Sequence, residues 1–485
     1  MNNKDILNAL NLVDDKFIEN SLPKEKAKST KIRFRSIVAA VLAVLVGLRI
    51  AVYFITDHPL SEYNTNPSVN NRPPLTLNIS GFTLKEVEYP DMAKLGTVSM
   101  DEWYDSLKKQ YDQYEGYNEG LDGFFAETTV RILGSRDGEN RIYSPLSLYM
   151  ALGMLAETTD GNSRKQILDL LGYNNIEDLR KQAEAVWNGN FCDNGLSRAL
   201  LASSIWLRDD LTYNDSTLEE LKNTYYASSY SGEMGSEDYN KALQNWINHN
   251  TGNLLTDYTQ NSGFDPETVL GLVSAVYFDA QWTSPFSEDN NTKDIFRSQA
   301  GEIECEFMNK TYQDRYYWAE NFSAVSLSFD QSGSMWFFLP DQNVSIDEVL
   351  SNEEIFSIIS EPYEYANSQY SKINFSVPKF DISSETELSK DLKELGVTDV
   401  FDMHSADFSP LTEYSDELYL SKAKQSSRVS IDETGCVAAS YTEMYLNAGS
   451  APPNDEIDFI LDRPFIFVIT GRSGMPMFIG VVETP

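Results

Sequence analysis

Helical and strand-like patterns occupy different parts of this chain of 485 residues. Between residues 146 and 172 apolar side chains recur every three to four positions, which predicts a helix ending at the C-cap signal Leu171-Gly172. Runs rich in Val, Ile and Phe predict strands at 272–278, 335–339, 373–377, 464–470 and 477–482. Residues 471–474 (Gly-Arg-Ser-Gly) join the last two runs and suit a hairpin loop. Because helices come early and strands late, the pattern predicts an α+β domain rather than alternating βαβ units.

One apolar stretch near the amino terminus is long enough to cross a membrane. Residues 37–55 are 19 residues with a single charge, Arg49, and a helix of that length spans roughly 28 Å. Six Lys and Arg residues precede it between positions 24 and 35. By the positive-inside rule, the sequence predicts a transmembrane helix at 37–55 with residues 1–36 in the cytoplasm. A cleaved signal peptide is the alternative, but its basic region would be unusually long and no A-x-A site is evident.

Two further segments separate this stretch from the periodic part of the chain. Residues 56–80 contain four prolines among Asn, Ser and Thr, which predicts an extended extracellular linker. Residues 81–114 are acidic and aromatic, and a helix is expected within this lead-in.

Composition and charge exclude several classes of function. Hydrophobic residues make up 41% and charged residues 23%, which is typical of a globular chain and too apolar for a disordered one. The net charge is −36, and because residues 1–55 carry +4, the other 430 residues carry −40. This excess argues against nucleic acid as a partner, since phosphate binding requires a basic face.

The sequence offers little to hold a cofactor or a metal. The sequence lacks the motifs typical of nucleotide binding, zinc binding, redox chemistry and serine hydrolases. A hydrolase function is therefore an alternative that no motif supports. No catalytic residue, cofactor or metal is predicted, because the cysteines are too few for a disulfide framework and the histidines too few for a His-rich site. These residues are Cys192, Cys305, Cys436, His58, His249 and His404.

Four blocks of sequence occur in a fixed order within residues 115–485. They are 140–147 (Asn-Arg-Ile-Tyr-Ser-Pro-Leu-Ser) with the helical segment after it, 272–296 around Trp282, the strands at 335–341 and 375–382, and the end of the chain from Arg428. Together they resemble the serpin family. The resemblance implies a serpin domain at 115–485, an α+β fold in which helices pack on three largely antiparallel or mixed sheets with an exposed reactive-centre loop.

Resemblance to that family implies a suicide-substrate mechanism. A protease cleaves the loop and forms an acyl-enzyme, and the loop then inserts as a new strand in the main sheet. The tethered protease is distorted before it can deacylate. The resemblance places the hinge of the loop at Glu433, Gly435, Cys436, Ala438, Ala439, Ser440 and Thr442.

The hinge can be tested against the period of two residues that a strand requires. One face of such a strand would carry Cys436, Ala438, Ser440 and Thr442, all small and uncharged. The other face would include Tyr441 and Glu443, which we expect to point toward solvent. Because a close-packed interior tolerates neither a charge nor a bulky ring, this alternation favours a working inhibitor. An accidental alternation in a small-residue loop is the alternative. Tyr441 would slow insertion if it obstructed the sheet.

The resemblance also implies two groups of residues that stabilise the hinge and the main sheet. Glu433 and Lys379 match the family's salt bridge near the breach tryptophan, Trp282, although a weak surface pair worth about 0–1 kcal/mol is the alternative. The polar cluster that gates sheet opening, called the shutter, is Ser144, Ser147, Ser274 and Gln425. Gln425 replaces the usual His, so it can hydrogen-bond but does not titrate near neutral pH.

Two counts locate the reactive bond. When residues are counted forward from Glu433, as in the family, the bond falls near Gly449-Ser450. When they are counted back from Pro464, it falls near Pro453-Asn454. The count from the hinge is preferred, and the alternatives nearby are Ala448, Leu446 and Asn447.

The composition of the loop constrains the target protease. No Lys, Arg or His lies between Arg428 and Arg463, which argues against trypsin-like targets. The small and aliphatic residues within 445–451 suit elastase-like or subtilisin-like pockets. Tyr445, Leu446 and Met444 leave chymotrypsin-like proteases as possible targets.

These features together predict a monomeric, membrane-anchored extracellular serpin of bacterial type, which inhibits serine proteases through a covalent acyl complex. Release of the domain from the membrane is left open. A non-inhibitory serpin that acts as a binding module is the alternative: the alternation in the hinge argues against it, and Tyr441 argues for it.

Overall fold

The computed structural model describes residues 79, 81–134, 138–260, 262–414, 418–420, 423–436 and 455–485. The predicted cytoplasmic segment, the membrane segment at 37–55 and most of the reactive loop lie outside these ranges. Within them, no helix is both long and apolar enough to cross a bilayer.

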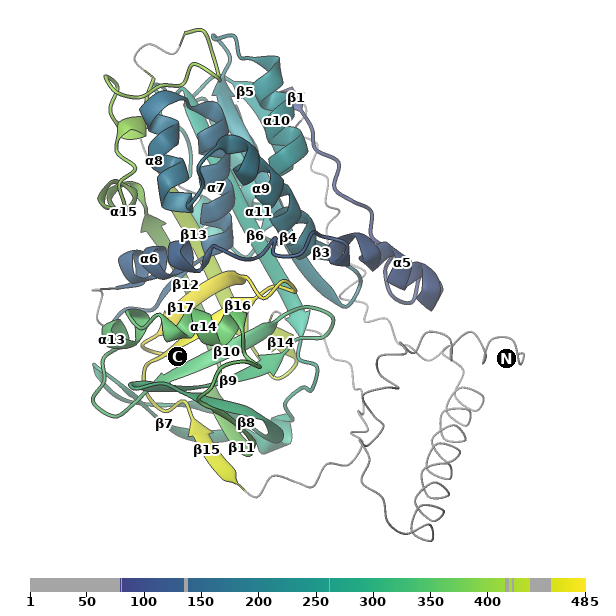
Figure 1. Cartoon of the computed structure of the whole chain (residues 1–485), viewed down its shortest axis with the longest axis vertical. Helices are drawn as coiled ribbons and strands as arrows, with labels where there is room; N and C mark the ends of the chain where they lie inside the picture. The colour runs from purple at the N-terminus through teal and green to yellow at the C-terminus, as the bar shows by residue number, and fades with distance from the viewer. Residues whose placement is uncertain are drawn as a thin grey trace, which may run out of the picture. The chain divides into compact units, whose positions relative to one another are not determined.

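An eight-stranded sheet, called here the long sheet, carries the hinge (Figure 1). β4 and β5 run parallel, and the other described neighbours run antiparallel. In hydrogen-bonded order the strands are β1 (Thr83–Lys85), β5 (Ala227–Gly232), β4 (Ser197–Arg208), β6 (Leu270–Gln281), β14 (Gly435–Cys436), β13 (Lys424–Ile431) and β12 (Phe380–Glu387), with β3 (Cys192–Asp193) beside β4.

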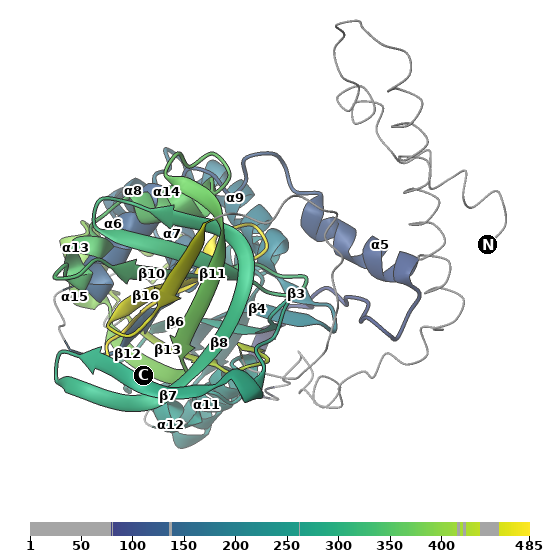
Figure 2. The ribbon, with the colours of Figure 1, turned by 90° about the horizontal axis from the view of Figure 1, so that it is seen from below.

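The five strands predicted from the sequence are all present. The first of them is β6 of the long sheet, and the other four lie in a second sheet of nine strands. Its longest strand curves around the others, as Figure 2 shows. In order the strands are β15 (Glu456–Ile460), β11 (Ser368–Pro378), β8 (Gly301–Trp318), β9 (Phe322–Ser328), β10 (Ser334–Pro340), β16 (Phe465–Thr470), β17 (Pro476–Val482) and β2 (Arg141–Tyr143), with β7 (Thr292–Ser298) beside β8.

Helices cover the long sheet on both faces. Leu243 and Trp246 of α11 cluster with Ala275 of β6 on one face, and α7 to α10 lie over the other face (Figure 1). The helices are α5 (Met100–Tyr111), α6 (Asp122–Leu133), α7 (Pro145–Thr158), α8 (Gly161–Leu171), α9 (Ile176–Asn190), α10 (Asp215–Tyr225), α11 (Glu237–Asn250), α12 (Thr256–Thr259), α13 (Ile346–Leu350), α14 (Glu354–Ser360) and α15 (Ser389–Glu394), with 3-10 turns at Glu288–Asn290 and Asp399–Phe401.

The helix predicted at 146–172 is two helices in the structure. The Ser144 side chain caps α7, and α7 ends at Thr158 because Thr159 and Asp160 adopt extended backbone. The predicted C-cap is confirmed: α8 ends at Leu171, and Gly172 has φ 81°, a conformation that glycine adopts without steric cost.

One continuous hydrophobic core joins both sheets to the helices. Phe337, Phe465 and Tyr149 are each 0% exposed within it. Burial of one large apolar side chain stabilises a fold by about 1.5–3 kcal/mol, so this core holds the frame around the hinge.

The lead-in segment is packed onto the domain. β1 pairs with β5 at the edge of the long sheet, and the expected helix is present as α5. Trp103 of α5 is 2% exposed, and its indole Nε1–H donates to the Asn194 carbonyl over 3.0 Å.

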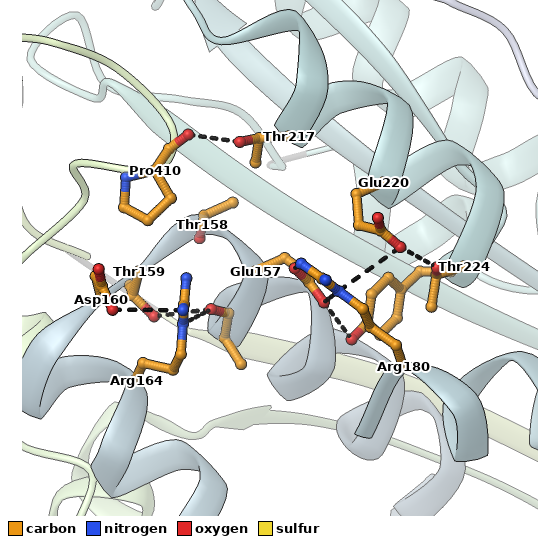
Figure 3. Close-up of polar contacts among 12 residues, drawn as sticks. Glu157, Thr158, Thr159, Asp160, Arg164, Arg180, Thr217, Glu220, Thr224 and Pro410 are labelled. Carbon is orange, nitrogen blue, oxygen red and sulfur yellow. Dashed lines mark hydrogen bonds and ion pairs between the residues drawn. The ribbon is translucent and has the colours of Figure 1, made fainter. Parts of the chain in front are cut away.

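An ion pair between a buried carboxylate and a partly exposed arginine fixes the carboxyl end of α7 (Figure 3). Glu157 is 3% exposed and accepts two hydrogen bonds from Arg180 of α9, over 2.8 Å from Nε and 2.7 Å from Nη2. The Tyr225 hydroxyl of α10 also donates to Glu157, over 3.2 Å. These bonds to Glu157 raise the pKa of Arg180 above its ordinary value. They hold three helices together and set the position of α7 behind the long sheet.

Replacement of Arg180 by Met is expected to destabilise the fold by about 3–5 kcal/mol, because it leaves the Glu157 carboxylate buried without its countercharge. Urea unfolding followed by tryptophan fluorescence measures the change. As a matched control, Lys165→Met removes the exposed pair with Asp169 and should cost less than about 1 kcal/mol. Equal effects of the two changes would contradict the assignment.

Candidate functional site

The chain turns back sharply between β13 and β14. The Asp432 carboxylate accepts hydrogen bonds from the backbone N–H of Thr434 over 2.8 Å and of Gly435 over 3.1 Å. Trp282 holds the same turn from β6: its backbone N–H donates to the Thr434 carbonyl over 3.0 Å, and its indole N–H donates to the Asp432 carbonyl over 2.9 Å. This turn directs β14 into the long sheet between β13 and β6.

The two residues of β14 fit closely between their neighbours. A Cβ atom at Gly435 would lie 2.3 Å from the Ala280 carbonyl oxygen, so only glycine fits there. Cys436 pairs with Ala280 on one side and with Ile431 on the other, and is 2% exposed. Burial raises the pKa of the Cys436 thiol far above its ordinary value. The thiol is therefore unreactive while β14 is in place.

Beyond Cys436, no described strand lies between β6 and β13, and this interval is called the gap here. Within the residues that the structure describes, no backbone pairing joins β6 directly to β13, although these strands flank β14. Residues 276–278 and 426–429 line a narrow space of about 20 Å³ next to Cys436. A further strand placed in this gap would complete the ladder between β6 and β13.

A polar network ties the hinge to the second sheet. Glu433 is 8% exposed, pairs with Lys379 over 2.6 Å and accepts a hydrogen bond from Asn291. Lys379 also pairs with Glu306 of β8 over 3.3 Å, and Asn291 donates to the same Glu306 carboxylate over 2.9 Å. One lysine and one asparagine thus bridge two carboxylates.

Aromatic side chains pack around the breach tryptophan. Trp282 is 2% exposed, stacks on Phe329 with ring centroids 4.7 Å apart, and meets Phe286 edge-on at 6.1 Å. The Lys310 ammonium lies 5.0 Å from the centre of the Phe286 ring, and burial lowers the pKa of Lys310 to about 8. This packing fixes the indole whose N–H holds the hinge turn.

The four predicted shutter residues lie together where α7 begins. Gln425 of β13 accepts from the Ser144 backbone N–H over 2.7 Å and donates to the Ser144 carbonyl over 3.1 Å. The Ser147 hydroxyl donates to the carbonyl of Ser274 in β6 over 3.3 Å. Thus α7 contacts both strands that flank the gap.

The family assignment follows from this arrangement and from comparison with known proteins. The family model described as serpin (serine protease inhibitor) matches residues 122–485. This chain belongs to the serpin family. Human neuroserpin is 28% identical over 374 residues, which cover 73% of this chain and 88% of neuroserpin. Serpin-ZX of Arabidopsis thaliana is 26% identical over 368 residues, 71% of this chain and 92% of that protein.

Solved serpin structures share the fold. The thermophilic serpin tengpin in its native state matches with a TM-score of 0.68 and 28% identity, over 77% of this chain and 95% of tengpin. The complex of thyroxine-binding globulin with thyroxine matches with a TM-score of 0.65 over 75% of this chain and 98% of that chain. At 20% identity, the second likeness concerns the fold alone. The predicted serpin fold is confirmed.

Part of the predicted site lies outside the described residues. These positions are Ala438, Ala439, Ser440 and Thr442 of the hinge and Leu446, Asn447, Ala448, Gly449 and Ser450 around the reactive bond. The structure does bring together Glu433, Lys379 and Trp282.

Sequence reasoning missed Asn291 and Glu306, which complete the network around Lys379. Asn291 precedes β7 and Glu306 lies in β8, so both are far from the hinge in sequence. Only side-chain contacts between the two sheets bring them beside Glu433, and no local sequence pattern marks either residue.

The pKa values within this network favour the charged pair. Burial alone would raise the pKa of Glu433, but hydrogen bonds from Lys379 and Asn291 outweigh it and hold the pKa below its ordinary value. Burial alone would lower the pKa of Lys379, but hydrogen bonds to Glu433 and Glu306 outweigh it and raise the pKa.

Acid is expected to loosen the hinge. Because the pKa of Glu433 is lowered in the folded state, its stabilising contribution is present above the ordinary value of 4.5 and is lost as the pH falls below it. Amide hydrogen exchange at 433–436, corrected for intrinsic rates, should therefore speed up below about pH 4.5. Glu433→Gln should exchange faster already at pH 7.

A control distinguishes this loss from general acid effects. Glu456→Gln removes a carboxylate from the exposed pair with Lys372 and should leave exchange at the hinge unchanged. If Glu433→Gln exchanges at the wild-type rate at pH 7, the network does not hold the hinge.

Gly435→Ala is expected to drive β14 out of the sheet, because the new Cβ would clash with the Ala280 carbonyl. In a Cys305→Ser background, labelling of Cys436 by a maleimide should rise roughly tenfold or more. Gly123→Ala, in open space on α6, should leave labelling unchanged. An unreactive Cys436 in Gly435→Ala would show that the close fit of β14 does not control the hinge.

Proposed function

We propose that this serpin is a suicide-substrate inhibitor of serine proteases with elastase-like or subtilisin-like specificity. The observation that carries the proposal is the gap between β6 and β13, which begins where β14 ends. The chain continues from Cys436 with small residues at every second position, so the same strand can extend into that gap.

The reaction that we propose begins as ordinary proteolysis. The protease serine Oγ attacks the carbonyl carbon of Gly449, and the amide bond between Gly449 and Ser450 breaks. The serine proton passes through the general base of the protease to the departing amine of Ser450. An ester then links the protease to Gly449, and extension of β14 carries the protease away before water hydrolyses the ester.

The driving force is completion of the long sheet. Backbone N–H and C=O groups on the facing edges of β6 and β13 gain partners when a strand enters between them. Each new hydrogen bond contributes about 0.5–1.5 kcal/mol net, and a strand of several residues forms bonds on both of its edges. Insertion therefore favours the trapped state over the native one.

We further propose that the inhibitor acts outside the cell and is anchored by residues 37–55. Support comes from the 19-residue apolar stretch and its basic flank. Bacterial origin, a monomeric state and the exact reactive bond stay predictions from the sequence.

A non-inhibitory binding module is the second candidate. The observation that favours it is an open hollow of about 1110 Å³ between α6, α14 and α15. Six of its lining residues are acidic and only Arg131 and Lys390 are basic, so the hollow suits a cationic small molecule.

Incubation of the detergent-solubilised chain with elastase, subtilisin, chymotrypsin and trypsin tests the proposal. A band at the summed mass that survives SDS is expected with elastase or subtilisin and not with trypsin. Mass spectrometry should place the cut within residues 444–453.

A hinge variant provides the matched control. Ala438→Arg should still be cleaved but should form no stable complex, because a buried charge blocks insertion. Cleaved loop together with fully active protease in every wild-type lane would instead identify a substrate-like or non-inhibitory serpin.

A further inference from the structure

Residues 282–286, called here the clasp, hold the turn of the hinge. Trp282 donates through its backbone N–H and its indole N–H to the carbonyls on either side of Glu433, over 3.0 and 2.9 Å. The Phe286 backbone N–H donates to the Glu433 carbonyl itself over 2.8 Å. Three consecutive carbonyls of the hinge turn therefore accept hydrogen bonds from the clasp.

Lys310 of β8 anchors the clasp from the second sheet. Its ammonium donates to the carbonyl of Ser284, in the middle of the clasp. The same ammonium lies 5.0 Å from the centre of the Phe286 ring and 5.8 Å from the centre of the Tyr312 ring. A cation over an aromatic face is attracted by about 0.5–1 kcal/mol at exposed sites and by more where water is excluded. One charged side chain thus contacts the clasp at two points.

The surroundings of this ammonium are apolar. Phe375 of β11 lies directly opposite Lys310 in the sheet, and its ring meets those of Phe286 and Tyr312 at centroid distances of 6.1 and 6.3 Å. Among the described residues, no carboxylate pairs with Lys310. Lys379 at the hinge, in contrast, pairs with two carboxylates. A lysine cation without a countercharge is poorly stabilised beside three aromatic rings.

The neutral form of Lys310 is accordingly favoured. Burial lowers the pKa of Lys310 to about 8. At pH 7.5 roughly a quarter of the molecules then carry a neutral amine, against about one in a thousand for a lysine with the ordinary value. A neutral lysine in an apolar setting is a nucleophile.

Solvent can reach this amine. Lys310 is only partly buried, and the neighbouring residue Ser284 is exposed. The aromatic rings favour an uncharged reaction partner, and the net charge of −36 repels anionic ones. An electrophile suited to the site is therefore small, neutral and able to form a bond with an amine, which describes an aldehyde.

We propose that Lys310 is a covalent modification site for small neutral aldehydes, and that its modification loosens the clasp on the hinge. The lone pair of Nζ attacks the carbonyl carbon of the aldehyde, and the resulting carbinolamine loses water to give an imine. One aldehyde is consumed and one water is released, so the step needs no oxidant or reductant. The proposal does not depend on the inhibitory function.

Loosening follows from the hydrogen-bonding capacity of the product. A lysine ammonium has three N–H donors, whereas an imine nitrogen has one when protonated and none when neutral. The carbon chain of the aldehyde also needs space between the ammonium position and the Phe286 ring. Both contacts of Lys310 with the clasp are therefore weakened, and Phe286 holds the Glu433 carbonyl less firmly.

The first experiment measures the labelling of each lysine in the detergent-solubilised full chain at pH 7.5. Propanal is the probe, sodium cyanoborohydride converts the imine into a stable secondary amine, and peptide mass spectrometry gives the rates. Lys310 should be labelled on the order of tenfold faster than Lys241. Lys241 is 59% exposed, but its bonds with Glu237 raise its pKa above the ordinary value. Labelling of Lys310 at the rate of Lys241 or more slowly would overturn the proposed site.

A matched pair of variants tests the cause of the reactivity. Ser284→Asp places a carboxylate next to the ammonium at an exposed position, so it should raise the pKa of Lys310 and slow its labelling severalfold. Ala300→Asp adds the same charge at the exposed turn before β8, ten residues upstream, and should leave the labelling unchanged. Equal labelling of Lys310 in both variants would show that its missing countercharge does not activate it.

The last experiment follows the hinge by amide hydrogen exchange at residues 433–436 after treatment with propanal and the reductant. The labelled wild type should exchange several times faster than the untreated protein. Lys310→Arg keeps the charge but lacks the primary amine, so the same treatment should not change its exchange rate, and Lys310→Met should likewise show no response. If the treated wild type and treated Lys310→Arg respond equally, modification of Lys310 does not loosen the clasp. No protease is involved, so a failure of protease trapping leaves these results unchanged.

Discussion

The structure depends on an incomplete ladder in the long sheet. β6 and β13 flank a strand of only two residues, and within the described chain nothing else pairs them with each other. Unpaired backbone groups at a strand edge are costly when shielded from water, and they recruit another strand when one is available. The hinge and the shutter both lie on the strands that flank this gap.

The ion pair between Arg141 and Glu483 is more deeply buried than the ion pairs of Lys379 at the hinge. Arg141 and Glu483 form a pair with side chains only 3% and 1% exposed, so both partners are shielded from water. Lys379 at the hinge is 33% exposed and is shared between two carboxylates. Buried pairs are costly to break, whereas a partly solvated lysine can exchange one partner for another or for water. The Arg141–Glu483 pair is therefore expected to be harder to break than the pair between Lys379 and Glu433.

The parts that could be predicted from the sequence were those governed by local patterns. Strands such as β10 and β16 were evident because unbroken runs of apolar side chains bury both faces. The break between α7 and α8 was missed because Thr159 and Asp160 interrupt the helix only in backbone conformation, while the apolar spacing continues. Asn291 and Glu306 join the hinge network through contacts between distant segments, so no single window of sequence predicts them.

Two polar clusters, the shutter and the network around Glu433, lie beside the gap and differ in how they respond to pH. At the shutter, Gln425 hydrogen-bonds to both backbone groups of Ser144 and cannot titrate, so these two bonds do not depend on pH. At the hinge, Glu433 is a carboxylate whose pKa is already lowered by Lys379 and Asn291, so its bonds persist throughout the neutral range. Neither Glu433 nor Gln425 is expected to change charge between pH 6 and 8. The hydrogen bonds of Glu433 and of Gln425 are therefore expected to persist across the neutral pH range.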